Sequence, residues 1–126
     1  METDTRRIPR SEWKAFFDGF SRRHAGWLAT LRILTPRLGA QIQALELPLE
    51  GIEADRESIS IHMGERPERH IAHPVEKPVQ AWVELETDGA ERALEIESAT
   101  GTKTILEFRS ALPPDMVDGV LAPARG

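Results

Sequence analysis

Residues 11–23, Ser-Glu-Trp-Lys-Ala-Phe-Phe-Asp-Gly-Phe-Ser-Arg-Arg, decide the fold that this sequence predicts. Their aromatic side chains recur at i, i+3, i+4 and i+7, a spacing that gathers them on one face of an α-helix; they are Trp13, Phe16, Phe17 and Phe20. Ser11 is placed to cap free backbone N–H groups, and Gly26 follows the expected end. The pattern predicts one amphipathic helix over about residues 11–23, with its aromatic face in the core.

After this helix the hydrophobic period becomes that of strands. Apolar and polar residues alternate in short segments separated by turn sequences, and no segment between them is long enough for a helical crossover between parallel strands. The expected strands are 27–34, 41–49, 58–63, 70–75, 79–86, 94–97 and 104–108. In the second strand the apolar positions change parity between Ala44 and Leu45, which predicts a bulge that curves the sheet.

These features predict an α+β fold. The N-terminal amphipathic helix is expected to pack on a strongly bent, mostly antiparallel sheet of about six strands, as a roll or a small open barrel. The length of 126 residues is that of one ordinary domain. We expect a flexible N-terminal segment (1–10), the domain itself (11–110) and a C-terminal tail (111–126) rich in Pro, Gly and Ala.

The composition excludes several classes of chemistry. The chain has no cysteine, so disulfides, thiol catalysis and cysteine-based zinc or iron–sulfur sites are absent. The first ten residues hold three arginines but no apolar signal region, and no stretch approaches the roughly 20 apolar residues that span a bilayer. A cytoplasmic protein is the expectation that follows.

Charge is unevenly divided along the chain. Residues 1–37 carry a balance of +4, whereas residues 38–126 carry −9. An acidic body disfavours nucleic acid, which needs a contiguous basic stripe on the protein. Only the N-terminal part offers cations for phosphates, and this weaker alternative would use Arg6, Arg7, Arg10, Arg22 and Arg23.

Several short motifs together resemble a known family of small bacterial proteins. They are Trp13-x-x-Phe16-Phe17-x-x-Phe20-Ser21, His24-x-Gly26-Trp27-Leu28, Leu45-x-Leu47-Pro48-Leu49-x-Gly51-Ile52-x-Ala54-Asp55 and Leu94-x-Ile96-x-Ser98. Their order covers nearly the whole chain. The family is a domain of unknown function, so the resemblance implies a single bacterial domain and brings no activity, cofactor or catalytic residue.

Three histidines form the candidate metal or small-ligand site. His62, His70 and His73 lie near the carboxylates of the 53–57 stretch, and imidazole with carboxylate can bind a divalent ion when three or four donors converge. On an extended segment, however, the rings of His70 and His73 would point to opposite faces, since side chains alternate with period two. Solvent-facing histidines are the simpler interpretation, and no cofactor is predicted.

A catalytic site has equally weak support in the sequence. Ser58, Ser60, His62 and Asp55 contain the residue types of a hydrolase site, but no nucleophile-elbow Gly-x-Ser-x-Gly motif occurs. Serines beside glutamates on a strand are also ordinary surface residues.

Trp82 is the remaining candidate, because it falls on the otherwise polar face that Gln80 and Glu84 define. It is either an anchor for a protein contact or a residue buried beneath the helix. We therefore predict a noncatalytic domain that acts through a protein contact or through self-association, with Trp82, Gln80 and Glu84 at the interface.

Overall fold

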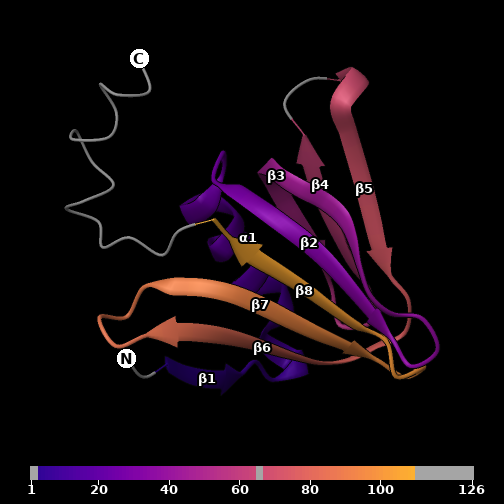
Figure 1. Ribbon diagram of the computed structural model, residues 1–126. Helices are drawn as coiled ribbons and strands as arrows, with labels where there is room; N and C mark the ends of the chain where they lie inside the picture. The colour runs from indigo at the N-terminus through magenta and orange to yellow at the C-terminus, as the bar shows by residue number, and fades with distance from the viewer. Residues whose placement is uncertain (1–2, 65–66, 110–126) are drawn as a thin grey trace, which may run out of the picture.

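The computed structural model describes residues 3–64 and 67–109, and within them it shows one α-helix and one sheet of eight antiparallel strands (Figure 1). The order of strands in the sheet is β1-β6-β7-β8-β2-β3-β4-β5. The helix is α1 (Trp13–His24), after the short 3-10 helix η1 (Arg10–Glu12), and η2 (Pro67–Arg69) precedes β5. The strands are β1 (Thr3–Arg7), β2 (Leu28–Thr35), β3 (Gly39–Ala54), β4 (Ile59–Gly64), β5 (His70–Val75), β6 (Pro78–Glu86), β7 (Glu91–Ser98) and β8 (Lys103–Phe108).

The predicted α+β class is confirmed, although the sheet has eight strands instead of about six and does not close into a barrel. The strand that no expected segment matches is β1, which pairs with β6 along its whole length. Residues 3–7 of the segment expected to be flexible (1–10) form this strand, which is held by main-chain pairing although its residues show no apolar alternation. The expected tail (111–126) lies outside the described residues.

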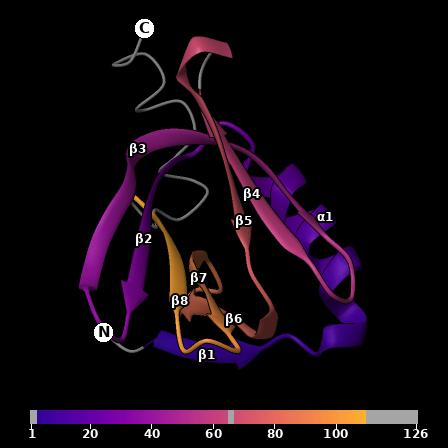
Figure 2. The same ribbon diagram turned by 90° about the vertical axis from the view of Figure 1, so that its right-hand side faces the viewer.

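The bend of the sheet lies in β3. Figure 2 shows this strand arching over the top of the molecule from the side of β2 to the side of β4. Its first part, Gly39–Pro48, pairs with β2, and β4 joins it only from Leu49 onward. The register shifts twice opposite β2, and Glu46 has a φ of 51°, so the bulge predicted near residues 44 and 45 is confirmed.

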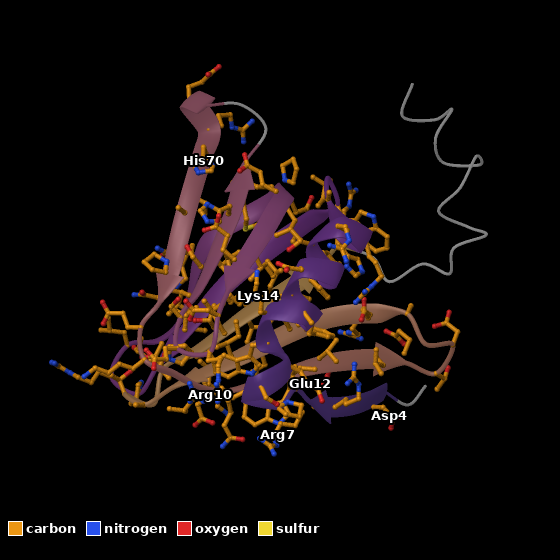
Figure 3. The ribbon with its side chains drawn as sticks, turned by 180° about the vertical axis from the view of Figure 1, so that it is seen from behind. Asp4, Arg7, Arg10, Glu12, Lys14 and His70 are labelled. Atoms are coloured by element: carbon orange, nitrogen blue, oxygen red, sulfur yellow. The ribbon has the colours of Figure 1, made fainter. Side chains whose placement is uncertain are left out.

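The helix packs on the concave side of the bent sheet, where it crosses in front of the central strands when seen from behind (Figure 3). Trp13, Phe17 and Phe20 have no exposed surface and belong to one core cluster with side chains from β2 to β8. The indole N–H of Trp13 donates to the carbonyl of Ile8 at 2.9 Å, so its polar atom is satisfied. Phe16 is only partly buried at the rim of this cluster.

The start of the helix differs from the prediction at Ser11. This residue lies inside η1, and neither η1 nor α1 has a side-chain hydrogen bond at its N-cap. The chain enters the helix instead through a backbone bond from Glu12 N–H to the carbonyl of Pro9, 2.8 Å long. Ser11 is therefore not the cap that its position suggested.

Candidate interaction surfaces

Trp82 lies on the convex face of the sheet, which is turned away from α1. Its neighbours Ala81 and Val83 are fully buried in the core, and side chains alternate along a strand. Trp82 itself is half-buried and stands in register with Arg7 of β1 and Glu95 of β7. It is thus not covered by the helix.

Charged side chains surround Trp82 on this face and pair with one another. Arg92 contacts the carboxylates of Glu84, Glu86 and Glu107 at 3.2, 3.3 and 3.2 Å. Glu107 also binds Arg32. Gln80 shares this face with Trp82 and Glu84, since the three alternate along β6. The predicted interface residues therefore lie together, beside an ion-pair network of two arginines and three glutamates.

A second surface lies on the hairpin of β2 and β3. Leu38, Ile42 and Leu45 are 68%, 57% and 65% exposed, and among the described residues the only other exposed large apolar side chain is that of Val79, at 39%. The sequence carries no charge from Leu38 to Leu45. We call Leu38–Leu45, the last residue of the turn and the first seven residues of β3, the free β3 edge. Within the described chain β2 pairs with this part of β3 on one side and no strand pairs on the other.

The two terminal edges of the sheet are better protected than the free β3 edge. β1 is five residues long and carries Asp4, Arg6 and Arg7. β5 contains Pro74, which has no backbone N–H to offer to a further strand. Short length, charge and proline are the usual means by which proteins prevent pairing at an edge. The free β3 edge has none of these three, although the register of β3 against β2 shifts between Ile42 and Ala44.

The three predicted metal ligands do not converge. His62 of β4 is opposite Ala72 of β5, whereas Ile61 is opposite His73, so His73 points to the other face from His62 and His70. The expectation that His70 and His73 face opposite ways is confirmed. Burial lowers the pKa of His73 from its ordinary value, because a half-buried ring is more stable in its neutral form.

His62 and His70 do meet two glutamates on the convex face. Their ring centres are 5.8 Å apart; Nε2 of His62 lies 3.5 Å from Glu53, and Nδ1 of His70 lies 3.1 Å from Glu50. Nε2 of His62 is buried and has no hydrogen-bond partner. In the described part of the chain, however, no three His, Asp or Glu side chains are arranged to hold a metal ion.

Three of the basic residues near the N-terminus make contacts within the domain. Arg6 stacks over the ring of Phe16 at 5.7 Å, Arg10 donates to the carbonyl of Pro78 at 3.2 Å, and Arg23 binds Glu91. A shallow, open cleft next to Arg10 is also lined by Asp55, whose carboxylate accepts backbone bonds in its own turn. Those bonds lower the pKa of Asp55.

His24 is a site that the sequence reasoning missed. Its side chain is 5% exposed and touches the rings of Phe20, Trp27 and Phe108. Nδ1 lies 2.9 Å from the carbonyl of Phe20 and Nε2 lies 3.5 Å from Glu91. The spacing of the sequence could have predicted this burial. His24 follows Phe20 by four residues and so lies on the same helical face as Trp13, Phe17 and Phe20.

The fold and these surfaces define a small α+β domain with one bent sheet, and the comparisons place it in a family. The model of the family of unknown function DUF5335 matches residues 4–116, so the chain belongs to that family. It is also similar to an uncharacterised protein of Aquifex aeolicus, with 28% identity over 111 residues that cover 86% of this chain and 96% of the relative. No solved structure matches the chain. No helix among the described residues could span a membrane.

Proposed function

We propose that this protein is a noncatalytic assembly domain that binds a second copy of its own chain. The observation that supports the proposal is the concentration of exposed apolar side chains on the free β3 edge. Leu38, Ile42 and Leu45 are each more than half exposed within eight residues. Apolar surface in water is unfavourable by about 25 cal/mol for each Å². A partner that covers this hairpin removes its apolar side chains from water, and this burial favours binding.

A second copy is the partner that suits this edge. The commonest soluble oligomers are two-fold dimers, in which the same patch of both chains meets itself. A patch with a net charge would repel its own copy. The free β3 edge has no charged residue, so two copies meet there without like-charge repulsion.

The noncatalytic part of the proposal is supported by how the candidate catalytic groups are used. The carboxylate of Asp55 accepts hydrogen bonds from Glu57 N–H at 2.8 Å and from the N–H and hydroxyl of Ser58 at 2.8 and 3.1 Å. This carboxylate holds the turn between β3 and β4 and is not oriented toward His62. Nε2 of His62 faces Glu53 instead.

Trp82 marks the alternative surface for a protein contact. Tryptophan is enriched among residues that dominate binding energy, and Trp82 stands on an accessible face with Gln80 and Glu84. A partner placed there would desolvate Glu84 and Arg92, which already pair with each other. The uncharged hairpin carries no such penalty, so we place the contact between copies on the hairpin.

Sedimentation velocity tests the proposal directly. The wild-type protein is expected to shift from monomer to dimer as its concentration rises through the micromolar range. Ile42→Lys puts a charge in the patch and should weaken the dimer at least about tenfold, which corresponds to about 1.4 kcal/mol. Val79→Lys is the matched control, because it charges another exposed apolar position, and it should dimerise like the wild type. A wild-type monomer at every concentration would contradict the proposal.

A further inference from the structure

We infer that two copies pair edge to edge, with β3 of one copy antiparallel to β3 of the other and the two-fold axis at Gln41. The two bent sheets then form one continuous sheet. This inference rests on the proposed self-association and names the strand that carries it. Its first support is the backbone of the free β3 edge, whose outer side meets no strand within the described chain.

Main-chain groups of this edge are available to a second strand. In an antiparallel strand the N–H and C=O groups of alternate residues point to the same side, and β2 takes only one side of Gly39–Pro48. The side chains leave the edge accessible, since residues 39–43 are all exposed. Extended backbone with unpaired groups is a ready template for another strand.

Charges at the two ends of the edge favour the antiparallel direction. Arg37 precedes the uncharged stretch, and Glu46 follows it. Antiparallel pairing centred on Gln41 places Arg37 of each copy next to the Leu45–Glu46 end of the other, whereas parallel pairing would align like charges. Within the described residues Arg37 has no ion pair, and Glu46 meets only the exposed Arg109, at 3.9 Å. Both charges are therefore able to form a pair between copies.

The side chains of the edge also match in this register. Ala40 and Ile42 are in register with Leu34 and Arg32 of β2 and share the convex face of the sheet. Centring on Gln41 puts Ala40 of one copy directly opposite Ile42 of the other, so small and large apolar groups face each other twice. Pairing becomes irregular from Gln43, where the register of β3 against β2 shifts, and ends near Leu45, because β3 bends away at Glu46. The shared edge therefore has a fixed length and closes as a dimer.

Cysteine cross-linking tests the register, and the natural absence of cysteine makes each variant a single reporter. Directly opposed residues in antiparallel strands have Cα atoms about 4.5–5.5 Å apart, within the range that a disulfide spans. Gln41→Cys should therefore form a disulfide-linked dimer under mild oxidation. Asp88→Cys, in the exposed turn between β6 and β7, measures random collision and should stay largely monomeric.

A mixing experiment separates antiparallel from parallel pairing. Ala40→Cys alone should link poorly, because its own copy lies on the diagonal at about 7–8 Å. Mixed with Ile42→Cys, it should give a linked heterodimer, readily identified by its mass. Parallel pairing would link each variant to itself equally well, and that result would overturn the inference.

The remaining outcomes distinguish this inference from the proposed function. A wild-type dimer in sedimentation whose Gln41→Cys variant does not cross-link would refute edge pairing and leave self-association intact. Cross-linking through Gln80→Cys in place of Gln41→Cys would move the contact to the surface around Trp82 and also refute it. A monomer at all concentrations would refute both. Circular dichroism of each reduced variant confirms that the sheet is folded.

Discussion

At the scale of single residues, His24 has the most unusual environment. Its ring is packed among three aromatic side chains, and the carbonyl of Phe20 can only accept a hydrogen bond, so Nδ1 must be the donor. A neutral ring then presents an unprotonated Nε2 toward the carboxylate of Glu91. Burial lowers the pKa of His24 from its ordinary value, and this effect exceeds the opposing effects of the Phe20 carbonyl and Glu91.

This environment predicts that acid destabilises the fold through His24. The unfolded chain takes up a proton at His24 near the ordinary value of about 6.5, whereas the folded chain does so only at lower pH. The free energy of unfolding should therefore be constant above about pH 6.5 and fall below it. Urea unfolding of wild type and His24→Phe at a series of pH values checks this.

The control for that experiment is His73, whose pKa is also lowered by burial. His24→Phe should lose less stability than the wild type as the pH falls below about 6.5, and the dependence that remains should shrink further in a double variant that also carries His73→Ala. An unchanged pH dependence in His24→Phe would show that folding does not lower the pKa of His24.

At the scale of elements, α1 does more than fill the concave side of the sheet. The hydroxyl of Ser21 accepts a hydrogen bond from Ile52 N–H at 2.8 Å and lies 2.7 Å from the carbonyl of Phe17, to which it donates. Beyond its bend β3 no longer has β2 as a neighbour, and Ser21 satisfies the backbone there. The helix thus covers the edge of β3 beyond the bend, around Ile52, whereas the free β3 edge stays uncovered.

Ser21→Ala should lower the free energy of unfolding by about 1–3 kcal/mol, because it leaves the Ile52 N–H without a partner. Ser11→Ala is the matched control: Ser11 is exposed and caps no helix, so its removal should change stability by less than about 0.5 kcal/mol. Chemical denaturation measures both. Equal losses in the two variants would contradict the role given to Ser21.

Sequence patterns predicted most of the helix and strand segments, because each of these segments buries one face and therefore repeats apolar residues at a regular spacing. The aromatic spacing gave the helix within two residues of its observed bounds, and period-two alternation gave β2, β4, β5, β6 and β8. β1 was missed because its five residues are polar throughout and contribute main chain to the sheet. The bulge near Leu45 was predicted from parity alone, although how far it bends the sheet depends on where β4 joins β3.

At the scale of the whole molecule, the surfaces were harder to predict than the fold. The uncharged run from Leu38 to Leu45 is visible in the sequence, but its exposure follows from topology, since β4 pairs with β3 only beyond the bend. The histidines illustrate the same limit: alternation separates His73 from His70, yet only the register shows that His62 meets His70. Alternation along a strand predicts which residues share a face of the sheet, and the order of the strands decides which faces and edges remain exposed.

Hydrogen exchange of the backbone amides, measured at low and high protein concentration, tests the central claim most directly. Pairing between two copies of β3 should slow exchange in residues 39–45 as the concentration rises, because amides that faced water become hydrogen bonded. Residues 80–84, around Trp82, serve as the internal reference and should not change. Protection that is independent of concentration in residues 39–45, or that rises around Trp82 instead, would contradict assembly through the free β3 edge.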